Sequence, residues 1–261
     1  MSEAWILFLG TAAGTPSKKR GLPSILLQYR GKYILLDIGE GSQRSLIKNG
    51  IGVNRIDHIL ISHLHGDHIF GLPGIIQTMS MEGRERKLSI ISPEGIEKIL
   101  NAASQITSYQ LEFPIEIIKP EGEISLEQYI SVYPFKTCHT NIESFGYIIK
   151  AFGTGKEKKE RFSLAYTGDT APCEELIEKI KGADVLIHDS TFDSSMVEKA
   201  IAFGHSTSSI AAKVAKMAGV KSLILFHISN RYNDKSEMIL DNALKIFKNT
   251  FLAEDGMKFY I

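Results

Sequence analysis

Cysteine is scarce in this chain of 261 residues, which contains only Cys138 and Cys173. Two cysteines cannot form the dense disulfide framework that staples a small secreted domain. They fit a protein with a reduced interior, and we expect each to be a small apolar core residue. The cysteine content therefore favours a cytoplasmic location.

Net charge and long apolar runs are missing as well. Lys plus Arg and Asp plus Glu both number 30, which excludes the strong overall basicity of many nucleic-acid binders but leaves local basic patches open. The first residues, MSEAWILFLG, hold an acidic residue and an apolar run far shorter than the roughly 20 residues of a membrane span. We expect no targeting segment, no membrane span and no membrane partner.

The pattern along the chain is one of short strands alternating with helices. Apolar, β-branched runs recur between Gly, Pro or Asn, among them AWILFLG, SILLQY, KYILLDIG, DHILISH, LSIIS, ISVYPF, RFSLAYTG, ADVLIHDS and KSLILFH. Helical patterns such as GSQRSLIKNG, GIEKILNAASQI and EELIEKIKG lie between several of them, and the clearest helix is expected over 207–218. These features predict one α/β domain over 1–261, with helices outside and sheet inside. A chain of this length folds without a structural metal, so any metal would serve chemistry.

The segment ILISHLHGDHIFGLPG concentrates metal-ligating residues: His63, His65, Asp67 and His68 lie within six positions. In an extended strand end, residues two apart project to the same side, so His63 and His65 can hold one ion. Gly66 permits a turn that directs Asp67 and His68 elsewhere, toward a second ion. Imidazole and carboxylate ligands suit zinc and, less exclusively, manganese or iron.

Three further candidates each follow the carboxyl end of an apolar strand: His139, Asp169 and His227. Strand ends on one side of a sheet are where α/β folds place their sites. Asp169 is the natural bridge, because a carboxylate can join two cations roughly 3.5–4 Å apart. His58 has no partner at ligand spacing, and we expect it to be structural.

With these residues in place, the chain resembles the ribonuclease Z family of the metallo-β-lactamase superfamily. The resemblance is carried by HLHGDH, TGDT, HDSTF, GHSTSS and FHISNRY, together with FLGTAAGTPSKKRGLPSILLQY and LLDIGEGSQRSL. It implies a four-layer αβ/βα sandwich and a zinc-dependent endoribonuclease that removes 3′ trailers from precursor tRNA. The implied reaction is two-metal phosphodiester hydrolysis that leaves a 3′-hydroxyl on the tRNA.

The resemblance also implies a role for individual residues. His63, His65 and His139 would hold the first of two Zn²⁺ ions, with Mn²⁺ or Fe²⁺ as alternatives. Asp67, His68 and His227 would hold the second, and Asp169 would bridge both. Asp67 would act as general base, and His205 with Asp189 would form a proton-relay pair. The family usually has Glu where this chain has Asp189.

Substrate contacts would come from local charge, because the total is zero. The resemblance suggests that seven residues contact RNA phosphates, riboses or bases: Lys18, Lys19, Arg20, Arg44, Ser229, Arg231 and Tyr232. Gly21 replaces an Asn of the family loop. The large arm with which well-known bacterial members grip tRNA is absent, since only 29 residues separate His139 from Asp169. A charged hairpin tip at 153–162, with Lys156, Lys158, Lys159 and Arg161, is the only substitute.

Two other functions compete with precursor tRNA cleavage. The missing arm favours a phosphodiesterase of the same fold that acts on small nucleotide diesters. A noncatalytic RNA-binding module would be expected to have lost ligands, yet every expected ligand is present. The family further suggests a homodimer, and the apolar segment IFGLPGIIQTMSM at 69–81 fits either a subunit interface or core.

Overall fold

The computed structural model describes residues 4–107, 111–153 and 159–261, and within them the chain divides into two compact units. Unit 1 comprises residues 1–119 and 254–260, and unit 2 comprises residues 120–253 with 261. Each unit consists of one seven-stranded sheet and a layer of helices. The α/β class is thereby confirmed, whereas a single domain over 1–261 stays a prediction.

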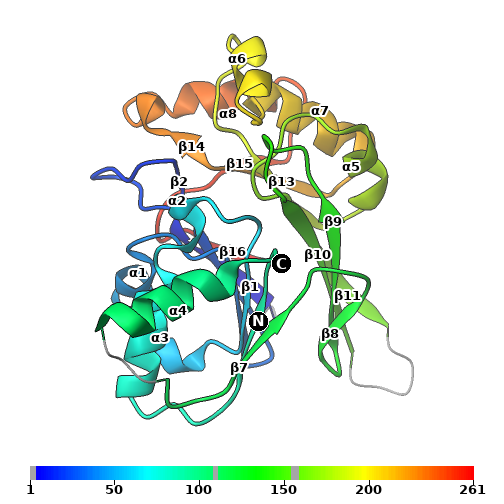
Figure 1. The fold of residues 1–261 in the computed structure, drawn as a ribbon. Coiled ribbons are helices and arrows are strands. Elements are labelled where there is room, and N and C mark those ends of the chain that lie inside the picture. The colour runs from blue at the N-terminus through cyan, green and yellow to red at the C-terminus, as the bar shows by residue number, and fades with distance from the viewer. Residues whose placement is uncertain (1–3, 108–110, 154–158) are drawn as a thin grey trace. The chain divides into compact units, whose positions relative to one another are not determined.

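The sheet of unit 1 has the strand order β16-β1-β3-β4-β5-β6-β7. Its strands are β1 (Ala4–Gly10), β3 (Ser24–Tyr29), β4 (Lys32–Leu36), β5 (His58–Leu60), β6 (Leu88–Ile91), β7 (Ile115–Ile118) and β16 (Lys258–Tyr260). Its helices are α1 (Ser42–Lys48), α2 (Gly66–Ile69), α3 (Leu72–Met81) and α4 (Ile96–Thr107), with a 3₁₀ turn η1 (Val53–Arg55) and the short strand β2 (Ala12–Ala13). Helices α1, α3 and α4 place Leu46, Ile75 and Ile96 in one buried cluster with the sheet (Figure 1).

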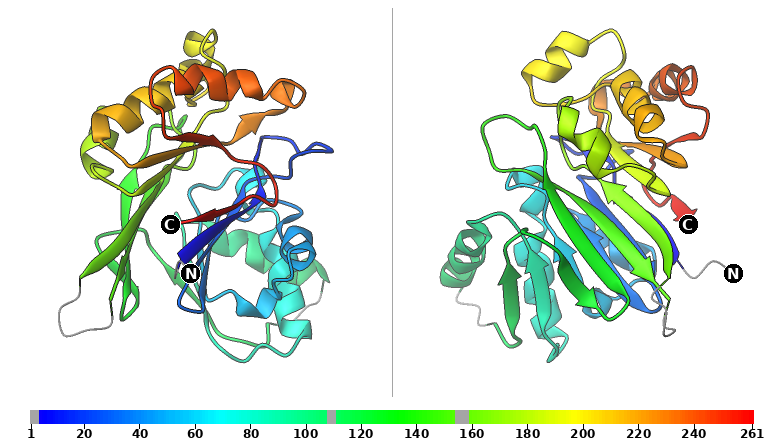
Figure 2. Two further views of the ribbon diagram at one scale, coloured as in Figure 1. Left: turned by 180° about the vertical axis from the view of Figure 1, so that it is seen from behind. Right: turned by 90° about the vertical axis from the view of Figure 1, so that its right-hand side faces the viewer.

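The sheet of unit 2 has the order β15-β13-β12-β11-β10-β9-β8. Its strands are β8 (Ile124–Glu127), β9 (Ile130–Lys136), β10 (Phe145–Phe152), β11 (Glu160–Tyr166), β12 (Val185–Asp189), β13 (Ser222–Phe226) and β15 (Thr250–Leu252). Its helices are α5 (Glu174–Lys179), α6 (Val197–Ala202), α7 (Ser208–Ala218) and α8 (Glu237–Leu244), with the short strand β14 (Ile228–Ser229) and a 3₁₀ turn η2 (Asn230–Tyr232). Figure 2 shows the long strands β9, β10 and β11 side by side.

Strand direction in unit 2 gathers the candidate residues. Strands β11, β12 and β13 are mutually parallel, and β9 runs the same way because both β9 and β11 are antiparallel to β10. Four carboxyl ends therefore meet at one edge of the sheet. His139, Asp169, Asp189 and His227 all lie at or just beyond these ends.

Most predicted elements are present, with some differences. Helix α7 begins after Thr207, whose hydroxyl accepts the Ile210 N–H, and it ends at Gly219 with φ 64°. Met217 lies on the outer face of this helix and is 68% exposed. In the segment 69–81, helix α3 buries Leu72 and Ile75 as core, while Phe70 is exposed. The hairpin expected at 153–162 is seen as β10 and β11, but Lys156 and Lys158 lie outside the described residues.

The expectation for the cysteines is wrong. Cys138 is exposed and Cys173 is only partly buried, and their sulfurs form a disulfide with a Cα–Cα distance of 6.0 Å. Cys138 follows β9 and Cys173 follows the loop after β11, so the common strand direction brings them to the same edge. A low cysteine count excludes a disulfide framework but not one single bond.

Within the described residues, the helices are too short or too polar to cross a lipid bilayer.

Gly39 provides a test of close packing in unit 1. A methyl group there would lie 2.4 Å from the Asp67 carbonyl oxygen and 2.5 Å from Leu22 Cβ, so the Asp67 backbone must shift. We expect Gly39→Ala to lower the free energy of unfolding by about 1–3 kcal/mol, measured by denaturant titration. Gly52→Ala is the control, because Gly52 has φ −66° and open space, and equal losses in both variants would contradict the packing argument.

Candidate metal centre

Unit 1 brings four of the predicted ligands together in the loop after β5 and in α2. His63 Nε2 and His65 Nδ1 lie 3.1 Å apart, and the His63 and His68 ring centroids are separated by 4.1 Å. His68 Nε2 lies 3.6 Å from Asp67 Oδ2. The Gly14 N–H donates to that same carboxylate oxygen. The spacing of these four residues in the sequence therefore does bring their side chains together on one side of unit 1.

A buried carboxylate that the sequence analysis did not select, Asp37, organises this group. Its Oδ1 accepts the Ser62 N–H at 2.7 Å and its Oδ2 accepts the Ser62 hydroxyl at 2.7 Å. Asp37 Oδ2 also lies 2.8 Å from His68 Nδ1. Asp37 directly follows the end of β4, the same signal that selected the other candidates, so the rule applied to His139 would also have selected it.

Unit 2 brings together the remaining predicted ligands. His139 Nε2 and His227 Nε2 lie 3.9 and 3.4 Å from Asp169 Oδ2. Two ligands on one tetrahedral zinc, each about 2.0–2.2 Å from the metal, are separated by roughly 3.4 Å. The Asp169 carboxylate thus lies at ligand spacing from both imidazoles, as a shared or bridging group requires.

The relay pair predicted from the family is in contact. His205 Nδ1 lies 2.8 Å from Asp189 Oδ2, so the shorter Asp stem reaches its partner. Burial raises the pKa of Asp189, but the charge and hydrogen bond of His205, together with the charge of His227, leave that pKa below its ordinary value. Asp189 is therefore a buried anion that accepts hydrogen bonds, with Thr170 N–H and Thr191 N–H as further donors.

Thr191 and Gly204 are two supporting residues that the sequence analysis missed. The Thr191 hydroxyl lies 2.8 Å from His227 Nδ1 and donates to Asp189 Oδ1 at 2.7 Å. The Gly204 carbonyl oxygen lies 2.7 Å from His139 Nδ1. Both contacts occupy Nδ1 and fix each ring with Nε2 on the Asp169 side, and no residue-type signal marks a backbone carbonyl in a sequence.

The donor chemistry in both units fits a divalent metal. Each unit presents imidazole nitrogens beside carboxylate oxygens, and the ligand atoms of Asp169, Asp189, His205 and His227 all lie within 4.8 Å of one another. Hydrogen bonds from the opposite ring nitrogen to a carboxylate, hydroxyl or carbonyl are the usual support of metal-bound histidine. The set contains nitrogen and oxygen but no thiolate, which suits zinc, manganese or iron.

The predicted basic loop divides into exposed and buried residues. Lys18, Lys19 and Arg44 are exposed and line a hollow of about 480 Å³, with Lys48 at its edge. Arg20 is instead buried, and its guanidinium donates to the Thr11 hydroxyl at 2.6 Å. Thr11 in turn donates to Asp255, so Arg20 holds the loop in place and is not available for RNA.

The residues of the C-terminal motif FHISNRY also differ in exposure. Arg231 is exposed, lies over the Phe192 ring at 5.0 Å and donates to the Ser229 hydroxyl. Tyr232 is only 1% exposed, and its hydroxyl donates to Asp193 Oδ2 at 2.6 Å. The expectation that Tyr232 stacks on a base therefore needs correction, because both faces of its ring are packed in unit 2.

Comparisons with known proteins agree with this geometry. The family model described as Anti-Pycsar protein Apyc1 matches residues 4–203. The chain is 39% identical to the ribonuclease Z of Metallosphaera sedula, with 96% of both chains covered, and 40% identical to that of Sulfolobus acidocaldarius, with 95% and 96% covered. The crystal structure of the short form of human tRNase Z matches with a TM-score of 0.81 at 29% identity and covers 98% of both chains.

A further structural match, at 20% identity, bears on the fold alone. The metallo-β-lactamase fold protein YhfI of Bacillus subtilis has a TM-score of 0.81 and covers 98% of this chain. The predicted superfamily fold is confirmed by these matches, and each unit supplies one sheet layer and one helix layer of that fold. The chain belongs to the family described by the Apyc1 model and to the ribonuclease Z family of metal-dependent, phosphodiester-hydrolysing endoribonucleases.

Proposed function

We propose that this chain removes 3′ trailers from precursor tRNA as a zinc enzyme with two ions per chain, and that it leaves a 3′-hydroxyl on the tRNA. The observation that carries the proposal is the hydrogen bonding of the proposed ligand histidines. Four of their imidazoles have Nδ1 within 2.9 Å of a protein oxygen. Metal-bound histidines usually have such support, and here it occurs beside carboxylates at ligand spacing, which favours a metal centre over a binding module. The family relationship directs the centre toward RNA.

The proposed ligand sets follow the donor groups. One ion would be held by His63, His65 and His139. The second would be held by Asp67, His68 and His227. Asp169 would bridge the two ions. Bound cations would lower the pKa of water and offset charge on the phosphate oxygens. Manganese or iron would satisfy the same donors.

The chain's own residues supply the proton transfers. Asp67 accepts a proton from the attacking water, because its carboxylate lies beside His68 and is partly open to solvent. His205 donates a proton to the departing 3′-oxygen. Asp189 accepts a hydrogen bond from the His205 Nδ1–H, which leaves His205 Nε2 as the proton donor. The Asp189 carboxylate also stabilises the imidazolium form of His205.

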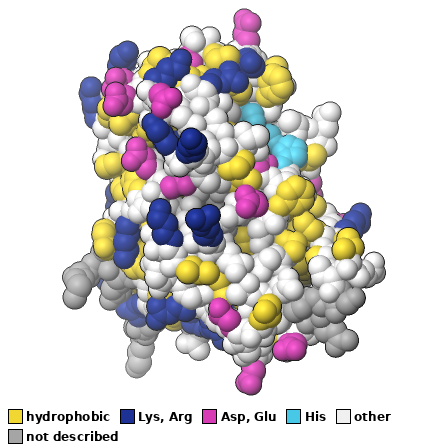
Figure 3. Space-filling model, turned by 90° about the vertical axis from the view of Figure 1, so that its left-hand side faces the viewer, with side chains coloured by type: hydrophobic (Ala, Val, Ile, Leu, Met, Phe, Trp, Pro, Cys, Tyr) yellow, Lys and Arg dark blue, Asp and Glu magenta, His cyan; other side chains and the backbone are white. Residues whose placement is uncertain are grey.

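Substrate contacts in the proposal come from exposed cations. Lys18, Lys19 and Arg44 would contact phosphates, as would Arg231, which Phe192 and Ser229 hold in place. On the face shown in Figure 3, basic side chains lie among acidic and apolar ones and do not merge into one large patch. In this proposal, RNA binding therefore depends on the few exposed basic side chains named above and not on one large basic patch. The proposed place of action is the cytoplasm, on the ground of the RNA substrate alone, since the two cysteines form a disulfide.

A second candidate function is hydrolysis of small nucleotide diesters. The spacing of β10 and β11 favours this function, because only residues 153–159 lie between the two strands, too few for a large arm. Both functions use the same centre, so they differ only in what binds beside it.

Cleavage of a 3′-extended tRNA with mapped ends tests the leading proposal. We expect zinc-loaded protein to release the trailer in a single turnover, with kcat/KM about a hundredfold or more above that for a small diester, because binding away from the reacting phosphate contributes to catalysis. Chelation should abolish cleavage and zinc should restore it. Arg44→Ala should lower kcat/KM for tRNA only. Equal rates on a folded precursor and a small diester would favour the second function.

His205→Ala tests the relay. We expect kcat to fall about 10²–10⁴-fold at fixed metal content, because a general acid contributes that much. Metal analysis of the same sample is the readout that separates this role from ligation. Lys216→Ala, an exposed change on α7, is the control. Unchanged turnover with metal still bound would remove His205 from the mechanism.

We also propose that the protein is a homodimer joined through α3, α4 and β7. These elements line an apolar hollow of about 320 Å³ that includes Leu100, Leu111 and Ile117. We expect sedimentation equilibrium to give twice the chain mass of 29.0 kDa, and Ile117→Glu to shift it to the monomer. Ile201→Glu on α6 is the control, and a wild-type monomer would contradict the proposal.

A further inference from the structure

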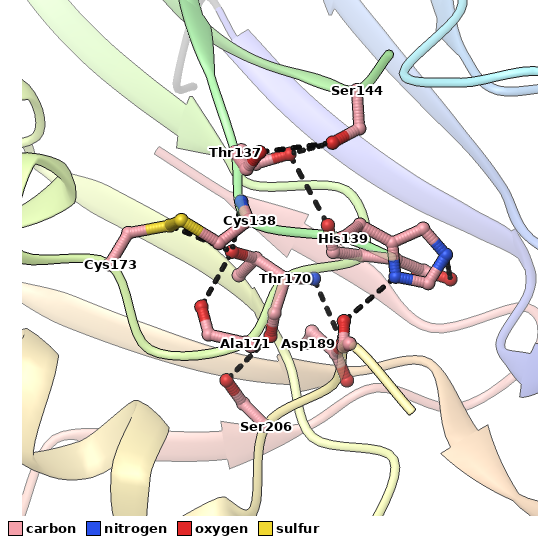
Figure 4. Close-up of a disulfide and its surroundings, with 11 residues drawn as sticks. Thr137, Cys138, His139, Ser144, Thr170, Ala171, Cys173, Asp189 and Ser206 are labelled. Carbon is pink, nitrogen blue, oxygen red and sulfur yellow. Dashed lines mark hydrogen bonds and ion pairs between the residues drawn. A yellow bond between two sulfur atoms is a disulfide. The ribbon is translucent and has the colours of Figure 1, made fainter. Parts of the chain in front are cut away.

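The disulfide lies beside two of the proposed ligands within unit 2. Cys138 directly precedes His139, and Cys173 lies four positions after Asp169 in the same loop. Figure 4 shows both half-cystines with His139, Thr170 and Asp189 around them. The bond therefore joins the segment that carries one ligand to the segment that carries the bridging carboxylate.

Hydrogen bonds already connect these two segments, and they show how closely the disulfide is coupled to the ligands. The Ala171 N–H donates to the Cys138 carbonyl oxygen at 2.7 Å, and the Cys138 N–H donates to the Thr170 hydroxyl at 3.2 Å. The Thr137 hydroxyl donates to the Asp169 carbonyl oxygen at 3.3 Å. The residues in these contacts all lie within two positions of His139 or Asp169, so the two segments are held together directly beside both proposed ligands.

The same loop is anchored to the relay on its other side. The Thr170 N–H donates to Asp189 Oδ2, and the Ser206 hydroxyl donates to the Thr170 carbonyl oxygen. Thr170 thus lies between the disulfide and the Asp189–His205 pair. Thr170 also contacts the disulfide itself, since Thr170 Oγ1 lies 3.7 Å from Cys173 Sγ.

We propose that the Cys138–Cys173 disulfide is a positioning element of the metal centre, which holds His139 and Asp169 at ligand spacing before an ion binds. The inference rests on the proposed function. Outer contacts that orient metal ligands typically change metal affinity 10–100-fold. Cys138 is exposed, so a dithiol reaches the bond. The dithiol gives two electrons and two protons to the cysteines, which become two thiols, and is itself oxidised to a cyclic disulfide.

Metal affinity of the oxidised and reduced protein tests the proposal. Wild-type protein is reduced with a dithiol, desalted without oxygen and checked by thiol alkylation and mass. Zinc affinity is then measured by competition with a chromophoric chelator. We expect reduction, and separately the double variant Cys138→Ala/Cys173→Ala, to weaken zinc binding about tenfold. Dithiol treatment of the double variant should have no further effect.

A control separates positioning from general stability. Ile239 on α8 is fully buried in the core of unit 2 and lies 70 residues or more from His139 and Asp169 in the sequence, so Ile239→Ala lowers the thermal midpoint with the disulfide intact. We expect its zinc affinity to match wild type. Equal zinc affinity in oxidised and reduced wild type would overturn the inference and leave the proposed function standing. Absence of zinc binding in the oxidised protein would overturn both.

Discussion

The candidate centre depends on one recurring interaction, the hydrogen bond between a ring Nδ1 and a fixed protein oxygen. His63, His68, His139, His205 and His227 each have such a contact, with Ser62, Asp37, Gly204, Asp189 and Thr191 respectively. This contact decides which nitrogen is presented to a ligand and removes ring rotation. A histidine without it would have to be ordered by the metal itself, at a cost in affinity.

The direction of the strands determines where the protein oxygens of these contacts lie. In unit 2, four strands that run the same way end at one edge, and the loops that follow carry both the ligands and their supports. In unit 1, Asp37 follows β4 and His63 follows the parallel neighbour β5. The backbone departs from ordinary conformations at a strand end in each unit: Asp37 in unit 1 has φ 54°, and His227 in unit 2 has φ 60°. Residues held in the left-handed region cost free energy, and they occur where a site requires a particular direction.

Much of this could be predicted from the sequence, and the failures have physical causes. The ligands were selected because His and Asp at strand ends are a residue-type signal. The supports were missed where the acceptor is a backbone carbonyl, as at Gly204, or a common hydroxyl, as at Thr191. Tyr232 and Arg20 were assigned to RNA because motif position does not reveal burial. The expectation for Cys138 and Cys173 fails because the tertiary fold brings the two residues together, and no sequence motif marks the pair.

The last residues of the chain close the first unit. Asp255 accepts hydrogen bonds from Thr11 and from Gly21 N–H, and β16 pairs with β1. During synthesis on the ribosome, the partners of the β1 edge and of the basic loop at 17–21 are consequently made about 240 residues after these segments. Apart from Ile261, unit 2 lies between these two pieces in the sequence and has all its strands available earlier. Synthesis of β16 therefore completes the edge strand of the N-terminal sheet.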